Sequence, residues 1–160
     1  MKTLVIYYSY DGNTDFIATT IAKHIRADVL RLEPVGEKKV KGFMKFIWGG
    51  KQVFSKEKPQ LRPFKKNPDD YEFLIIGTPV WAWTYAPALA TFFDEVNVMD
   101  KNIALFCCCQ GAAGNVFGNM RQKLMGNKIV GEKTFFDPLS HDLDKNADVA
   151  RGWVEGLGIS

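Results

Sequence analysis

The chain has 160 residues, of which 46% are hydrophobic and 24% are charged, and its net charge is +3. This composition is typical of a globular protein and excludes a disordered chain, a collagen-like repeat and a disulfide framework. The length predicts a single domain over residues 1–160, and the basic residues form no long run that would indicate nucleic-acid binding.

Strand and helix patterns alternate from the start of the chain. An apolar run at residues 4–8 predicts a first strand. Ile17, Ile21 and Ile25 then recur at helical spacing, which predicts a helix that begins near Thr14. Further apolar runs at residues 29–32 and 73–76 predict the second and third strands.

The alternation continues to the end of the chain. Pro87 suits the first turn of a helix over residues 87–96. The remaining patterns predict, in order, a strand, a helix, a strand and a closing helix at residues 103–108, 116–124, 129–136 and 143–157. Five strands that alternate with about five helices predict an α/β fold with a parallel sheet.

Residues 33–71 are the irregular part of the pattern. Residues 43–48 predict a short amphipathic helix that Gly49 and Gly50 end. The lysines from Lys38 to Lys58 stand among aromatic residues. We interpret this segment as a solvated basic face over packed aromatics rather than as a nucleic-acid surface.

Residues 73–93 carry no charge and are long enough to span a bilayer. Gly77, Pro79 and Pro87 divide them, however, into a strand, a loop and a helix start, so we expect no membrane span. The first ten residues lack the pattern of a signal peptide, so we expect a cytoplasmic protein.

Three cysteines stand side by side at Cys107, Cys108 and Cys109, which is the spacing of neither a disulfide loop nor a zinc site. We interpret them as small hydrophobic residues of a buried strand, with a redox role for Cys109 as the alternative. His24 and His141 share no motif with them, so we predict no metal site and assign no catalytic residue.

The loop after the first strand, Ser9 to Thr14, is rich in hydroxyl and amide groups and leads directly into a helix. Gly12 can take a positive φ there, and the helix dipole favours an anion at this end. We therefore predict a phosphate-binding loop with the side chains of Ser9, Asn13 and Thr14 as donors. An ordinary capped turn uses the same residue types and is the alternative.

The loop after the third strand, residues 78–85, places Trp81, Trp83 and Tyr85 where solvent normally favours polar residues. Flat rings at a ligand-binding edge predict stacking on a planar heterocycle, and Pro79 stiffens the loop. The alternative is that Trp81 and Trp83 pack under a neighbouring loop.

The loop after the fourth strand, residues 110–115, is small and flexible and can bring N–H groups against the edge of a ring. Neither a dinucleotide-binding glycine fingerprint nor a nucleoside-triphosphate loop occurs in the chain.

These three loops together resemble those of the flavodoxin family over the whole length of the chain. The resemblance implies a doubly wound, five-stranded parallel sheet of order 2-1-3-4-5, helices on both faces, and FMN at the switch point between strands one and three. It also implies the cofactor-binding residues, which are Ser9, Tyr10, Asp11, Gly12, Asn13, Thr14, Thr78, Pro79, Val80, Trp81, Ala82, Trp83, Cys109, Gln110, Gly111 and Gly114.

The chain departs from the family pattern in four ways. The loop after the fourth strand lacks the Tyr that often covers the other face of the flavin. Asp11 stands where the family usually has Thr, so we expect its carboxylate to turn away from the phosphate. Ala82 stands where electron-carrying members commonly have Gly, which disfavours the rearranged turn that supports one-electron chemistry. The net charge is basic, whereas typical carriers of the family are acidic.

Three functions compete. The first is an electron carrier between a reductase and an acceptor protein, and the second is an NAD(P)H-dependent FMN or quinone reductase of the same fold. The third, a non-flavin signalling module, needs paired acids after strand one and an Asp at the end of strand three. Only Asp11 follows strand one and Thr78-Pro79 ends strand three, so the first two are favoured, with a redox protein or NAD(P)H as partner.

Overall fold

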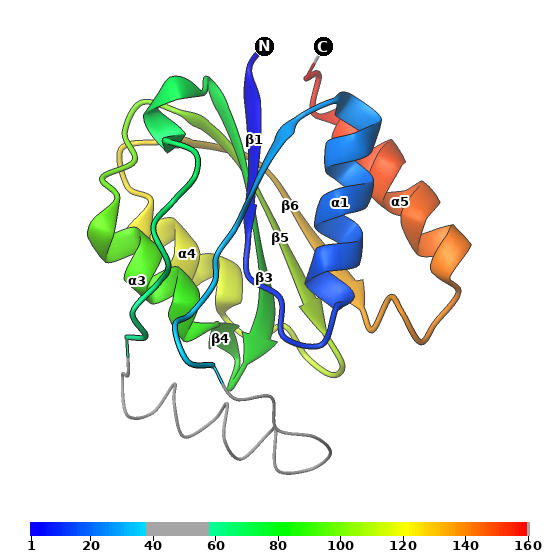
Figure 1. Cartoon of the computed structure of the whole chain (residues 1–160). Helices are drawn as coiled ribbons and strands as arrows, with labels where there is room; N and C mark the ends of the chain where they lie inside the picture. The colour runs from blue at the N-terminus through cyan, green and yellow to red at the C-terminus, as the bar shows by residue number, and fades with distance from the viewer. Residues whose placement is uncertain (38–57, 160) are drawn as a thin grey trace.

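The computed structural model describes residues 1–37 and 58–159 and contains one parallel sheet (Figure 1). Its order is β2-β1-β3-β5-β6, with a short β4 paired to β3. The five long strands are β1 Thr3–Tyr7, β2 Asp28–Arg31, β3 Phe73–Trp81, β5 Asn102–Cys109 and β6 Lys128–Phe136. Every pairing between them is parallel. The doubly wound, five-stranded sheet and its predicted order are therefore confirmed.

Two pairs of helices cover the two faces of the sheet (Figure 1). α1 Asn13–Ile25 and α5 Leu143–Gly156 lie on one face, and α3 Pro87–Glu95 and α4 Val116–Lys123 lie on the other. The described part of the chain has one further helical turn, η1 Pro68–Asp70. No helix in residues 1–37 and 58–159 is long and apolar enough to cross a membrane.

The side chains of β1 alternate between two hydrophobic cores, one on each face of the sheet. Val5 and Tyr7 join the cluster under α1 and α5, whereas Leu4 and Ile6 join the cluster under α3 and α4. All four side chains are buried, because helices cover both faces of a parallel sheet. This burial explains why each strand appears in the sequence as a continuous apolar run.

The structure corrects the end of the third strand. β3 does not stop at Ile76 but continues to Trp81, and Pro79 pairs with Cys108 of β5. Proline is tolerated there because β1 has already ended at Tyr7, so no strand on that side needs the missing N–H. The predicted loop over residues 78–85 is therefore partly a hairpin, in which β4 Thr84–Tyr85 runs antiparallel to β3.

The other predicted elements end within one or two residues of the observed ones. The helix expected at residues 43–48 and the basic aromatic segment up to residue 57 lie outside the described residues.

Gly77 lies in the middle of the sheet directly against the ring of Phe106. A Cβ atom at this position would approach Phe106 Cζ to 2.1 Å. We expect Gly77→Ala to lower the free energy of unfolding by about 1–3 kcal/mol through overpacking. Gly152→Ala is the matched control, because Gly152 lies in α5 with no atom within 4 Å of the place that a Cβ would take, and alanine there should be neutral or stabilising. Urea denaturation measures both, and equal stability of the two variants would contradict the contact.

Candidate functional site

Three connections meet at the carboxyl edge of the sheet, which is the lower edge in Figure 1. They follow β1, β3 and β5, and the winding direction of the sheet reverses between β1 and β3. Ligands of open α/β sheets bind at such a switch point. The predicted phosphate loop, aromatic loop and glycine-containing loop are these three connections.

Two buried hydroxyls distinguish the connection after β1. Ser9 and Thr14 are only 4% and 0% exposed, and neither side-chain oxygen has a hydrogen-bond partner in the structure. The Thr14 hydroxyl lies near the Cys108 thiol, whose pKa burial raises and Thr14 lowers. A thiol is a weak acceptor, so an oxygen of a ligand would be a better partner for this hydroxyl. A buried hydroxyl without a partner costs about 1–3 kcal/mol, so these two groups fit a ligand that supplies acceptor oxygens.

The backbone of this connection also suits an anion. Gly12 has a φ of 101° and precedes α1 without a side-chain cap. The first N–H groups of α1 therefore receive no capping hydrogen bond from the residue at the cap position, and the positive end of the helix dipole lies beside Ser9 and Thr14.

Asn13 is used differently from the prediction. Its Nδ2 donates to Asp137 Oδ1 over 3.1 Å, and its Oδ1 accepts from the Leu139 N–H at 2.9 Å. The Asn13 side chain therefore fastens the start of α1 to the connection between β6 and α5 instead of serving as a free donor.

The Asp11 carboxylate bonds the backbone of its own loop. Asp11 is exposed, and its Oδ1 accepts the N–H of Asn13 at 3.1 Å. The reason for this bond is local. A short carboxylate can accept the N–H two residues further on, and the first N–H groups of a helix have no partner within the helix.

Arg31 is a charged neighbour of this loop that none of the predicted motifs includes. Its Nη1 donates to Asp15 Oδ1 over 3.0 Å, and its Nη2 donates to the Ser9 carbonyl over 3.4 Å. Asp15 also accepts a hydrogen bond from the Tyr7 hydroxyl at 2.6 Å. Burial, followed by this carboxylate, raises the pKa of Tyr7. Only the strand register could have indicated that Arg31 lies near this loop, because Arg31 pairs with Tyr7 on the neighbouring strand.

The two tryptophans of the hairpin have different surroundings. Trp81 is half-buried, with its ring edge-on to Tyr8 and Tyr10 at centroid distances of 5.6 and 5.7 Å. Trp83 is 64% exposed at the tip of the hairpin. The ring of Trp81 is thus an aromatic wall held in place by Tyr8 and Tyr10, whereas the ring of Trp83 is open to contact with a ligand.

The tip of the hairpin is strained. Ala82 and Trp83 both have positive φ, at 46° and 63°. Two such residues match the twist of a two-residue hairpin, but for a residue with a Cβ this conformation costs about 1 kcal/mol or more. Ala82 therefore already holds a positive φ in this structure, whereas the sequence argument placed that strain in a rearranged turn.

The connection after β5 holds the strained tip in place. Gly114 approaches Trp83 so closely that a Cβ would lie 2.4 Å from Trp83 Cβ. The N–H of Asn115 donates to the Trp83 carbonyl over 3.1 Å, and Asn119 Nδ2 donates to Thr84 Oγ1 over 2.8 Å. Asn119 lies in α4, outside the predicted motifs.

The remaining predicted residues line the same edge or support it. Thr78 is buried, and its hydroxyl donates to the Pro79 carbonyl and accepts the N–H of Ala86, so it is engaged with backbone at the start of α3. Val80 is half-buried next to the hairpin. Gln110 and Gly111 are exposed, and the Cys109 thiol donates to the Gly111 carbonyl over 3.4 Å.

The three cysteines are free and buried. Burial raises the pKa of Cys107 to about 12 and also raises that of Cys109. High pKa values disfavour the reactive thiolate, which agrees with small hydrophobic residues in a strand. Among residues 1–37 and 58–159, no group of His, Cys, Asp or Glu side chains is suited to hold a metal ion.

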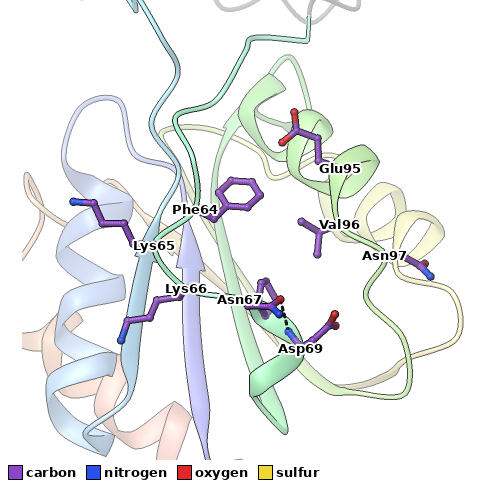
Figure 2. Close-up of a pocket in the computed structure, with 9 residues that line it drawn as sticks. Phe64, Lys65, Lys66, Asn67, Asp69, Glu95, Val96 and Asn97 are labelled. Atoms are coloured by element: carbon purple, nitrogen blue, oxygen red, sulfur yellow. Dashed lines mark hydrogen bonds between the residues drawn. The ribbon is translucent and has the colours of Figure 1, made fainter.

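A hollow of about 660 Å³ lies elsewhere, between the segment before β3 and the carboxyl end of α3. Figure 2 shows Phe64 and Val96 on its two sides, while Lys65 and Lys66 extend away from it. None of the three connections at the carboxyl edge lines this hollow, so it is separate from the candidate site.

Comparison with known proteins agrees with this architecture. A family model described as flavodoxin matches residues 2–155. No match was found among curated proteins.

Three solved structures illustrate the shared fold. A flavoprotein in complex with FMN from Lactobacillus acidophilus NCFM is 19% identical, with 87% of this chain and 96% of that chain covered and a TM-score of 0.71. A proposed flavoprotein from Bacteroides uniformis ATCC 8492 is 18% identical, with 96% and 97% covered and a TM-score of 0.80. Oxidised Flavodoxin 2 from Bacillus cereus is 16% identical, with 99% and 98% covered and a TM-score of 0.60. At these identities the likeness concerns the fold.

The contact between Gly114 and Trp83 can be tested by substitution. Gly114→Ala should lower the free energy of unfolding by about 1–3 kcal/mol, because the new Cβ meets Trp83 and the backbone keeps a positive φ of 59°. Gly111→Ala, in the same connection with nothing within 4 Å, should change it by less than about 0.5 kcal/mol. Urea denaturation measures both variants, and equal effects would show that the two connections do not interlock.

Proposed function

The chain belongs to the flavodoxin family, and on this premise we propose that it is a redox protein that moves electrons through noncovalently bound FMN. The observation that carries the proposal is the pair of buried hydroxyls, Ser9 and Thr14, that have no partner at the amino end of α1. FMN carries a phosphate monoester whose oxygens are acceptors for such groups.

The phosphate end would be held by the connection after β1. Ser9 and Thr14 offer hydroxyl donors, and the backbone of Tyr10, Asp11 and Gly12 offers N–H groups. Asn13 contributes by holding the connection in shape through Asp137. The dipole of α1 adds about half a positive charge at this end.

The ring end would lie between the hairpin and the connection after β5. Trp83 is exposed and can stack on a flat heterocycle, and Trp81 is held by Tyr8 and Tyr10. Small residues on the other side allow close approach of backbone N–H groups to the ring. The residues proposed for this end are Thr78, Pro79, Val80, Trp81, Ala82, Trp83, Cys109, Gln110, Gly111 and Gly114. When bound, FMN supplies the electron chemistry, and the protein supplies position and electrostatics.

The second candidate function is an NAD(P)H-dependent FMN or quinone reductase, and Ala82 is the observation that favours it. Ala82 and Trp83 already hold the tip at positive φ, and Asn115 binds the Trp83 carbonyl. A tip that is pinned and carries Cβ atoms rearranges less readily than one with glycine, which favours transfer of two electrons together. The net charge of +3 would also attract a phosphorylated donor.

An anaerobic titration distinguishes the two candidates. We expect the purified protein, supplied with FMN, to show a flavin absorption spectrum that dithionite bleaches under argon. Rapid bleaching by NADH or NADPH alone would support the reductase, whereas bleaching that requires an added reductase would support the carrier. No change in the absorption or fluorescence of FMN when the protein is added at equilibrium would contradict both.

The two hydroxyls give the sharpest test of FMN binding. Ser9→Ala and Thr14→Ala should each weaken FMN binding by about 1–3 kcal/mol, because each loses a hydrogen bond to a charged group. Riboflavin binding should not change, since riboflavin lacks the phosphate. Thr19→Ala is the matched control in α1, because the Thr19 hydroxyl donates to backbone carbonyls of Asp15 and Phe16. Calorimetry measures all three, and equal losses for FMN and riboflavin would contradict a phosphate role.

A further inference from the structure

The side chain of Asp11 occupies a donor of the candidate phosphate site. Asp11 Oδ1 accepts the N–H of Asn13 at 3.1 Å, and Asn13 is the first residue of α1. N–H groups in the first turn of a helix lack intrahelical partners and are the groups that bind anions. The carboxylate of Asp11 therefore bonds one of the donors that a phosphate at this position would use.

The two neighbouring hydroxyls show that the loop still has donors without an acceptor. Ser9 Oγ and Thr14 Oγ1 are buried and have no partner, although Asp11 is near in sequence to both. Asp11 thus covers only part of the site. A ligand that reaches all the donors has to share or displace the Asp11 carboxylate.

The charges around the loop make this competition unfavourable for a phosphate. Asp15 is offset by Arg31, whose Nη1 lies 3.0 Å from Asp15 Oδ1. Asp137 is bound by the neutral amide of Asn13. Among residues 1–37 and 58–159, neither Asp11 nor Asp137 forms a salt bridge with a basic side chain. A phosphate dianion would therefore bind beside the carboxylates of Asp11 and Asp137. The nearby guanidinium of Arg31 is already paired with Asp15.

We propose that the charged carboxylate of Asp11, which holds the N–H of Asn13, weakens the FMN complex and shortens its lifetime by repelling the ligand phosphate and competing with it for this donor, so that FMN is an exchangeable ligand of this protein. This inference rests on the proposed function. It assigns to Asp11 an effect on the phosphate end alone, because its contact lies at the start of α1 and not at the hairpin that would hold the ring.

Two substitutions separate the charge of Asp11 from its role in the turn. Asp11→Asn keeps an oxygen that can accept the Asn13 N–H but removes the charge. Asp11→Thr removes the charge and adds a hydroxyl donor. Both variants should fold, since Asn and Thr also accept N–H bonds in such turns.

The experiment compares the wild type, Asp11→Asn, Asp11→Thr and the control Asp70→Asn as apoproteins. Asp70 is an exposed acid in η1, ahead of the amino end of β3, so its substitution makes the same change in net charge at a distance. Quenching of flavin fluorescence measures the dissociation constants of FMN and riboflavin, and dilution of the preformed complexes measures the dissociation rates.

We expect both Asp11 variants to bind FMN about tenfold more tightly than the wild type, a change of ~1.4 kcal/mol, mainly through slower dissociation. Riboflavin binding by all four proteins and FMN binding by Asp70→Asn should stay within about twofold of the wild type.

Unchanged or weaker FMN binding by both Asp11 variants would overturn the inference. So would an equal gain for riboflavin or for Asp70→Asn, because the effect would then not act at the phosphate. If the wild type binds neither FMN nor riboflavin, the proposed function itself fails. That result is distinct from flavin binding that is insensitive to Asp11.

Discussion

The position of β3 between β1 and β5 is the constraint on which the rest of the structure depends. Its first five residues pair with both neighbours, and the side chains of Phe73, Leu74, Ile75 and Ile76 are buried because helices cover both faces of the sheet. Beyond Gly77, β3 extends past the end of β1. Thr78 and Pro79 pair only with β5, and the strand then enters the hairpin with β4. One strand therefore anchors the fold and carries the aromatic wall of the site.

The site combines a rigid scaffold with local strain. The hairpin tip has two residues with Cβ atoms at positive φ, and Gly114, Asn115 and Asn119 hold it against the connection after β5. Strain of this kind persists only where surrounding contacts over-determine the backbone, and it concentrates at functional sites. The same contacts would limit rearrangement of the tip beside a bound ring.

Electrostatics at the amino end of α1 act on an anion in both directions. The α1 dipole, the loop N–H groups and two buried hydroxyls favour an anion, whereas the carboxylates of Asp11 and Asp137 oppose one. Two unit charges 4 Å apart interact by about 1 kcal/mol in water and by more near a protein surface, so each carboxylate is comparable to one hydrogen bond. A balance of this kind is compatible with a ligand that binds selectively and still leaves.

Local patterns in the sequence were sufficient to predict the order of strands and helices, the parallel sheet and the three connections at its carboxyl edge. Apolar runs, helical spacing and the proline at the start of α3 depend on neighbours in the chain, so they are readable without a structure. Only the tertiary structure decided the length of β3, because Pro79 looks like a strand end until β1 is seen to stop before it. It also decided the partners of the site: Asn13 bonds Asp137, 124 residues away, and Arg31 reaches Ser9 across the sheet. Such contacts follow from packing between elements, and no local pattern encodes which distant side chain will fill a given place.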